Sequence, residues 1–303
     1  MNDGCLFFNA GSRHAIHLIV ALASLRKHWQ GPVAVVTEVD GPGRRVAEAC
    51  AEDGRLGAIQ VIPSEEVQAG GSGKAYYSKT KLPRLTPFDR TIFLDADVLV
   101  VKPFQELWPE EGEAVITQFS DWVSTGGKMS QRIKGWREVE PHRVARQLAE
   151  KWPAINTGVI AWCGDGGEWA QDWTDTGSRR ISFIGDEIAM QLIFPDHECR
   201  IVACHFNASP VFDACPIREK YKWPWDEEHG VAVRSEDVRV WHFHGFKAWK
   251  RPAGWKLYRQ NYMDALDVNL AGIREHPVNG KHLNLLPEQD QRIIRGAMMA
   301  AVS

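Results

Sequence analysis

The first part of the chain alternates short apolar runs with segments in which apolar residues recur at helical spacing. The apolar runs occupy residues 6–8, 32–36 and 58–62. Between them, residues 16–29 and 46–51 place apolar side chains three or four positions apart, which indicates helices. Continuous apolar runs are typical of strands buried on both faces. The order strand, helix, strand, helix, strand therefore predicts a parallel sheet with right-handed crossovers.

Further apolar runs continue this arrangement towards the carboxyl terminus. They predict strands at 91–94, 155–162, 200–204 and 238–243, and a helix at 186–194. The polar stretch at about 120–152 lacks a strand pattern and predicts a helical insertion, while residues 261–303 resemble a helical tail. We therefore expect an α/β fold over residues 1–260, in which a mostly parallel central sheet is flanked by helices.

The composition limits the classes of partner. The chain has 303 residues, of which 44% are hydrophobic and 25% charged, and its formal net charge of −3 predicts no nucleic-acid partner. No window approaches the roughly 18 apolar residues of a transmembrane helix. Residues 1–4 lack the basic start of a signal peptide, and the six cysteines form no Cys-x-x-Cys pair. We expect a cytoplasmic protein without a transmembrane segment.

Two carboxylates, Asp95 and Asp97, follow directly after the predicted strand 91–94, and a second apolar run, 98–101, follows them at once. Ligands of open α/β sheets bind at the carboxyl ends of parallel strands. Two carboxylates at such a position repel each other unless a cation joins them. The alternative is an exposed turn with two solvated aspartates, but the preceding buried strand favours a metal site.

A third metal ligand and a phosphate contact are predicted in residues 241–247. The imidazoles of His242 and His244 lie at the end of the last predicted strand. Gly245 would let the backbone approach an anion closely, and Lys247 would supply a positive charge for a phosphate. Two carboxylates, one imidazole and phosphate oxygens favour Mn²⁺ or Mg²⁺ over zinc. These considerations leave open which of the two histidines is the ligand.

Four motifs in this order resemble those of the glycogenin-like glycosyltransferases of family 8, over roughly residues 4–250. The motifs are a strand followed by Asp-x-Asp (Ile92-Phe93-Leu94-Asp95-Ala96-Asp97), an Asn-x-Gly-Val strand (Asn156-Thr157-Gly158-Val159), an acidic helix start (Asp186-Glu187) and a segment rich in His, Gly and Lys (His242-Phe243-His244-Gly245-Phe246-Lys247-Ala248-Trp249). Lys79, sixteen residues before Asp95, and the helix end Ser24-Leu25 also fall where the family has them. The ordered set is far more specific than any single motif.

The resemblance implies a GT-A fold and a retaining hexosyltransferase that takes a sugar from a UDP-sugar, with Mn²⁺ or Mg²⁺ as cofactor. It does not identify the acceptor. The implied metal ligands are Asp95, Asp97 and His242, with His242 preferred over His244 because it aligns with the family's position. The implied donor contacts, besides the two aspartates, are Ala10, His14, Lys79, Ala96, Gly245 and Lys247. The implied catalytic or sugar-holding residues are Asn156, Asp186 and Glu187.

Two departures from the family pattern affect the expected chemistry. Glu187 stands where the family usually has Gln, and the segment after Lys247 lacks the family's proline and lies one residue closer to its His. Asp186 and Glu187 open a predicted helix, whose positive end should hold both as anions at neutral pH. An anion below the anomeric carbon would stabilise or attack an oxocarbenium-like centre. Alternatively, Glu187 only complements the helix dipole.

Two other activities fit part of the pattern. A sugar nucleotidyltransferase also uses a parallel sheet and a divalent ion, but it would need a glycine-rich phosphate loop after the first strand, where residues 9–13 contain one glycine. A catalytically inactive nucleotide-sugar binding module would not need Asp186 and Lys247 together with the metal ligands. We therefore favour the glycosyltransferase.

Overall fold

The computed structural model describes residues 2–11, 14–52, 56–69, 73–120, 131–208 and 238–242. The strands are β1 (Asp3–Asn9), β2 (Val33–Glu38), β3 (Gln60–Ser64), β4 (Arg90–Asp95), β5 (Val98–Val100), β6 (Ala114–Ser120), β7 (Ala154–Cys163), β8 (Cys199–Val202) and β9 (Val240–His242). The helices are α1 (Ala15–Arg26), α2 (Pro42–Ala51), α3 (Lys74–Lys79), α5 (Pro141–Glu150), α6 (Gly167–Arg179) and α7 (Gly185–Ile193). Within these ranges, no helix is long and apolar enough to cross a membrane.

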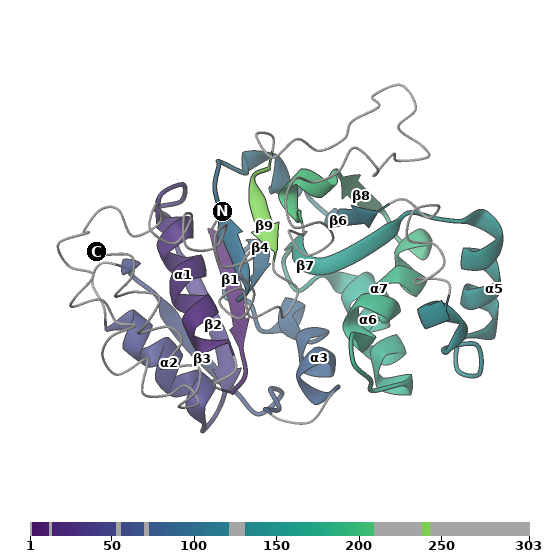
Figure 1. The fold of residues 1–303 in the computed structure, drawn as a ribbon, viewed down its shortest axis with the longest axis horizontal. Helices are drawn as coiled ribbons and strands as arrows, with labels where there is room; N and C mark the ends of the chain where they lie inside the picture. Colours follow the sequence, from purple (N-terminus) through teal and green to yellow (C-terminus); the bar gives the residue numbers. More distant parts are fainter. Residues whose placement is uncertain are drawn as a thin grey trace, which may run out of the picture.

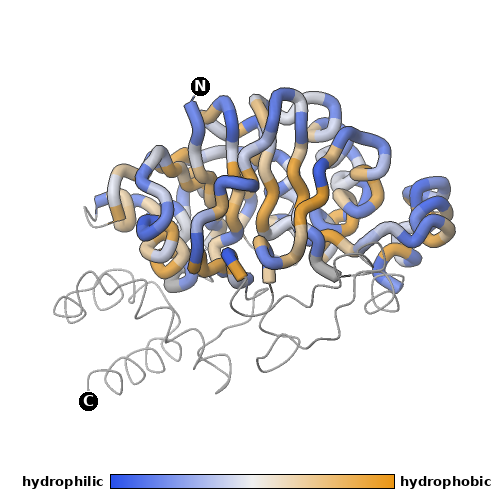
Figure 2. The backbone as a smooth tube through the Cα atoms, turned by 90° about the horizontal axis from the view of Figure 1, so that it is seen from above, coloured by the Kyte–Doolittle hydropathy of each residue, from blue (hydrophilic) through white to orange (hydrophobic). Residues whose placement is uncertain are grey.

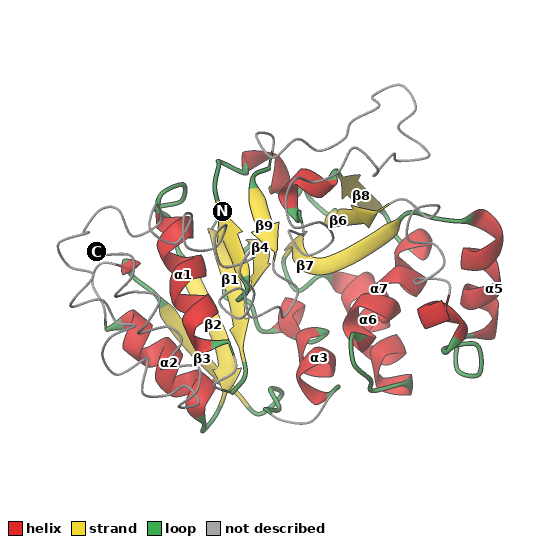
Figure 3. Ribbon diagram, in the orientation of Figure 1, coloured by secondary structure: helices red, strands yellow, loops and turns green. Residues whose placement is uncertain are grey.

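A seven-stranded sheet in the order β3-β2-β1-β4-β7-β6-β8 forms the centre of the molecule (Figure 1). The strands β3, β2, β1 and β4 run parallel to one another, and β6 runs parallel to β8. Only β7 is reversed, because it pairs antiparallel with both β4 and β6. Figure 3 shows β7 as a long, curved strand that begins near α5. The predicted α/β fold with a mostly parallel central sheet is confirmed.

Helices cover both faces of the sheet, which explains the continuous apolar runs. Successive residues of β4 point to opposite faces, so that Ile92 and Leu94 join the core beneath α1 and α2, whereas Phe93 joins the core beneath α6 and α7. In Figure 1, α1 and α2 lie on the left of the sheet and α5, α6 and α7 on its right. The hydrophobic residues in Figure 2 concentrate accordingly along the central strands.

A second, two-stranded sheet lies beside the end of β4. In it, β5 pairs antiparallel with β9, the strand predicted at 238–243. The backbone N–H of Val100 in β5 donates a hydrogen bond of 3.0 Å to the buried Ser24 hydroxyl of α1. Helix α1 therefore holds the strand that leaves the Asp-x-Asp turn.

The structure adds two elements that the sequence pattern did not predict, namely β6 and α6. The helical insertion expected at about 120–152 is described only from residue 131 onwards, where residues 131–134 and α5 are helical. The run predicted as a strand at 200–204 forms β8 and then a short 3₁₀ turn. The expected tail, 261–303, and the domain boundary at 260 lie outside the described residues.

Candidate active site

Three predicted metal ligands meet where the two sheets adjoin. Asp95 is the last residue of β4, and Asp97 lies in the turn before β5. Because Val98 lies opposite His242 in the β5–β9 ladder, the imidazole reaches this turn. Its Nε2 atom is 3.1 Å from Asp97 Oδ1 and 3.5 Å from Asp95 Oδ2. One ligand atom from each residue lies within 4.8 Å of the others, so the three could hold one divalent ion.

The charges of this cluster depend on one another. His242 and Asp97 are only 3% and 5% exposed. Burial opposes ionisation, but the adjacent His242 imidazolium outweighs it and holds the pKa of Asp97 well below its usual range. Burial likewise disfavours the imidazolium, yet Asp97 raises the pKa of His242. Two carboxylates and an imidazole form a donor set that fits a divalent cation, which would offset the same negative charge.

Lys79, the last residue of α3, lies between two carboxylates. Its Nζ atom is 2.8 Å from Asp95 and 3.3 Å from Asp186 Oδ2, and the residue is 5% exposed. Burial lowers the pKa of Lys79, but the two carboxylates outweigh that effect and raise it above its ordinary value. The side chain therefore stays cationic and cannot serve as a general base at neutral pH.

The first turn of α7 brings Asp186 and Glu187 into the same cluster. Thr157 donates a hydrogen bond of 2.7 Å to Asp186 Oδ2, and Asn156 Nδ2 donates one of 2.6 Å to Glu187 Oε2. Arg132 Nη1 lies 3.3 Å from Glu187 Oε1. The three carboxyl groups of Asp95, Asp186 and Glu187 are thus linked through these polar side chains and Lys79.

The expectation that Glu187 is a full anion at neutral pH is wrong. Burial raises the pKa of Glu187 to about 7, against the opposing effect of Arg132, so the group is partly protonated near neutrality. The side chain is only 10% exposed. Desolvation of a carboxylate therefore outweighs the favourable end of the helix dipole, which is typically worth about 0.3–1 kcal/mol.

The Asn-Thr-Gly-Val motif occupies an irregular part of β7. Ile116 of β6 pairs with Ile160, but the next residue, Thr117, pairs with Asn156, so residues 157–159 have no partner in β6, although Val159 still pairs with Leu94 of β4. Such irregularities bend a strand and redirect its side chains. Here they direct Asn156 and Thr157 towards α7.

Asn207 is a buried member of the cluster that the sequence analysis missed. It is 1% exposed, and its Oδ1 atom is 2.8 Å from Nδ1 of His242. Its Nδ2 atom donates to Thr117 Oγ1 at 2.7 Å and to Asn156 Oδ1 at 3.0 Å. A polar residue shortly after the apolar run of β8 is a weak signal of the kind that identified Asp95, and it could have suggested Asn207.

Three solved glycosyltransferase structures are similar to this chain. The galactosyltransferase LgtC in complex with donor and acceptor sugar analogues is 17% identical, with 97% of this chain and 99% of that chain covered and a TM-score of 0.61. An active-site mutant of LgtC with glutamate in place of glutamine is 16% identical, with 88% and 95% covered and a TM-score of 0.60. The bifunctional glycosyltransferase WbbM is 11% identical, with 87% of this chain and 51% of that chain covered and a TM-score of 0.56. The chain has a GT-A fold.

No family model matches the sequence, and no curated protein matches it. At these identities the similarity establishes the GT-A fold, as the four motifs implied, and leaves the roles of individual residues as predictions.

Ala10 and His14, two of the implied donor contacts, lie between β1 and α1. Ala10 follows β1 directly, and the next residue, Gly11, donates its backbone N–H to both carboxylate oxygens of Glu38, at 3.2 and 3.3 Å. His14 precedes α1, and after the larger effects of burial and His242 its charge also lowers the pKa of Asp97. Ala96, between the two aspartates, is buried. The predicted residues Gly245 and Lys247, and the alternative ligand His244, lie outside the described residues.

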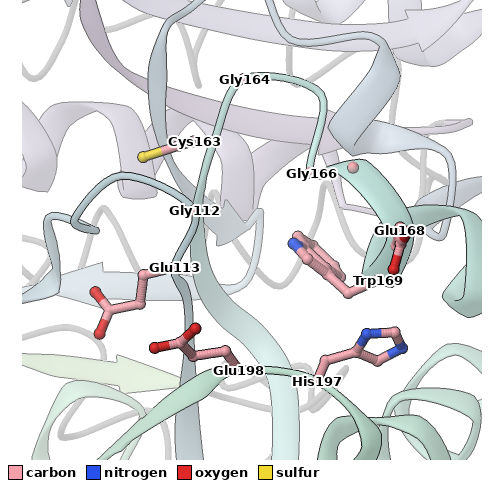
Figure 4. A pocket seen from close by; sticks show the side chains of 10 residues that line it. Gly112, Glu113, Cys163, Gly164, Gly166, Glu168, Trp169, His197 and Glu198 are labelled. Atoms are coloured by element: carbon pink, nitrogen blue, oxygen red, sulfur yellow. The ribbon is translucent and has the colours of Figure 1, made fainter.

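A cavity of about 360 Å³ lies elsewhere in the GT-A fold (Figure 4). Its lining includes Trp169 and Cys163, and Cys163 pairs with Arg90 at the start of β4, whereas Asp95 is at the end of that strand. None of the predicted site residues lines it. The cavity is therefore separate from the candidate active site.

Proposed function

We propose that the protein is a metal-dependent, retaining glycosyltransferase that transfers a sugar from a nucleoside diphosphate sugar, preferably a UDP-sugar, to an acceptor. The observation that carries the proposal is the cluster of Asp95, Asp97 and His242 next to the buried Lys79. The GT-A fold supports it, since the similar enzyme LgtC was solved with donor and acceptor sugar analogues.

The metal cluster would stabilise the departing nucleoside diphosphate. Asp95, Asp97 and His242 would hold Mn²⁺ or Mg²⁺, which when bound supplies positive charge against the negative charge that develops on the diphosphate. Lys79 offsets part of the negative charge of Asp95 and Asp186 in the same region. Lys247 and Gly245 remain the proposed diphosphate contacts, and Ala10 and His14 the proposed contacts to the base.

The polar side chains at the start of α7 and in the adjacent part of β7 are suited to binding the sugar of the donor. Asp186 is 2% exposed, and its Oδ1 atom is buried without a hydrogen-bond partner among the described residues, so it can accept a hydroxyl of the sugar. Asn156 holds the carboxyl group of Glu187 through a hydrogen bond of 2.6 Å. We propose Glu187 as the group that steadies or attacks the anomeric centre.

The first test is a panel of nucleotide sugars incubated with Mn²⁺, with release of free nucleoside diphosphate as the readout. Chelation should abolish turnover and Mn²⁺ should restore it. Asp97→Ala should lose activity while it remains folded, because the substitution removes a ligand rather than a core side chain. Full activity in excess chelator would refute the metal assignment.

The second test concerns Glu187. The motif resemblance gives Gln at this position, and one similar structure is an LgtC active-site mutant with glutamate in place of glutamine. If Glu187 acts in the transition state, Glu187→Gln should lower turnover by about 10²-fold or more with little change in donor affinity. Near wild-type turnover would assign the role to Asp186 or to the substrate. The anomeric configuration of the product, determined by NMR, tests retention.

A further inference from the structure

The amide groups of Asn156 and Asn207 can be oriented from their neighbours alone. The backbone N–H of Gly158 lies 2.7 Å from one terminal atom of Asn156. A backbone N–H can only donate, so that atom is the oxygen Oδ1. The Asn156 nitrogen then faces the Glu187 carboxyl group, where it donates at 2.6 Å.

This orientation fixes the next amide. Asn207 presents one terminal atom to Asn156 Oδ1 at 3.0 Å, and since Oδ1 is an acceptor, the Asn207 atom is the nitrogen Nδ2. Thr117 gives the same result independently. Its hydroxyl donates to the backbone carbonyls of Asn156 or Val159, at 3.1 and 2.8 Å, and accepts from Asn207 at 2.7 Å.

The oxygen of Asn207 must therefore face His242. It lies 2.8 Å from Nδ1, and an amide oxygen can only accept, so Nδ1 of His242 carries a hydrogen. In a neutral imidazole with hydrogen on Nδ1, the lone pair belongs to Nε2. Nε2 is the atom that faces Asp95 and Asp97.

We propose that Asn207 is a positioning residue that holds His242 in the tautomer and ring orientation needed for metal binding through Nε2. The inference rests on the metal site of the proposed function and adds a residue to it. Hydrogen bonds from the second nitrogen of a metal-bound histidine commonly fix its tautomer, and their loss typically weakens metal binding about 10–100-fold.

Backbone hydrogen bonds next to Asn207 hold it beside His242. The next residue, Ala208, donates its N–H to Val240 of β9 at 2.9 Å, and its carbonyl accepts from the N–H of His242 at 2.8 Å. Asn207 and His242 are thus held together by the main chain as well as by their side chains. Substitution at Asn207 can change the imidazole contact while these backbone bonds remain.

The test measures Mn²⁺ binding to the full chain by the decrease in the electron paramagnetic resonance signal of free Mn²⁺. Asn207→Ala should raise the Kd about 10–100-fold. Gln147→Ala is the matched control, because it also removes a buried amide, one on α5 whose Nε2 donates to the Trp152 carbonyl at 3.3 Å, and its Kd should stay within about threefold of wild type. If the wild type binds Mn²⁺ and Asn207→Ala binds it equally well, the role of Asn207 is overturned. If the wild type does not bind Mn²⁺, the metal site of the proposed function fails first.

A second measurement does not depend on whether Asn207→Ala folds. In wild-type protein with ¹⁵N-labelled histidine and bound Mg²⁺, the His242 ring, assigned from its absence in His242→Asn, should carry hydrogen on Nδ1 and none on Nε2. A hydrogen on Nε2 in the Mg²⁺-bound protein would contradict the inference.

Discussion

Gly158 has no side chain, and this leaves room for the imidazole ring of His242 in β9. A Cβ atom built on Gly158 would overlap the Cε1 and Nδ1 atoms of His242 and crowd Oδ1 of Asn156. The glycine of the Asn-Thr-Gly-Val motif is therefore required by packing against the metal-ligand candidate. This contact links the β7 motif to β9 directly.

Gly158→Ala should accordingly displace His242 and weaken Mn²⁺ binding by about tenfold or more, which isothermal titration calorimetry can measure. Gly177→Ala is a suitable control, since it adds a methyl group at a buried position of α6 that contacts Thr80 instead. Equal Mn²⁺ affinities for the two variants would show that the imidazole does not need this space.

Glu187 should make stability depend on pH. Its pKa is about 7 in the folded chain and 4.5 ordinarily, so the folded state binds more protons between these values and loses stability as the pH rises through them. Glu187→Gln removes this titration. As the pH rises from 4 to 8, the free energy of unfolding of the variant should increase relative to that of the wild type by up to about 3 kcal/mol. Urea unfolding of both proteins across this range tests it, and a difference that does not vary with pH would contradict the raised pKa.

Some site residues could be predicted from sequence and others could not. Asp95 and Asp97 follow an apolar strand, and the carboxyl end of such a strand is where α/β proteins bind ligands. Their place in the site could therefore be predicted from the sequence. Asn207 has only the weak signal of a polar residue shortly after the apolar run of β8. Arg132 has none, because it lies in a polar stretch without a strand pattern and its partner Glu187 is 55 residues away. The charge of Glu187 was misjudged because desolvation depends on burial, which helix position does not reveal.

Among the elements, apolar runs predicted most strands but not how they pair. The run at β7 shows burial on both faces and says nothing of direction, so its reversal in the sheet was not predicted. In β6, the polar residues Thr117 and Gln118 interrupt the apolar run. Both are buried, and Thr117 is used to bind Asn207 and the carbonyls of β7. Because these buried polar residues interrupt the apolar pattern, the sequence did not predict β6 as a strand.

The contact between α1 and β5 should be important for stability. Ser24→Ala leaves the buried N–H of Val100 without its partner, and an unsatisfied buried donor costs about 1–3 kcal/mol. We expect a loss of this size in the free energy of unfolding, determined by urea denaturation. Ser178→Ala, an exposed serine at the end of α6, should change it by less than about 0.5 kcal/mol. Equal effects of the two substitutions would show that the α1–β5 hydrogen bond contributes little.

For the whole molecule, a bound metal should stabilise the fold. The ligands come from both sheets, so an ion that binds only the folded chain adds about 2.7 kcal/mol at a concentration 100 times its Kd. Thermal unfolding with and without Mn²⁺ should show a higher Tm for wild type and no shift for Asp97→Ala. The exposed-acid variant Asp175→Ala should shift as wild type does. A shift that persists in Asp97→Ala would locate the ion elsewhere.

The distance along the chain between these ligands has a consequence for the order of folding. Asp97 and His242 are 145 residues apart, and β9 can pair with β5 only after that long loop has closed. Contacts that close long loops incur their entropic cost first and tend to form late, after local strands and helices are in place. An interaction absent from the transition state for folding changes mainly the unfolding rate. A metal ion bound between the two sheets would therefore slow the loss of the native state without accelerating its formation.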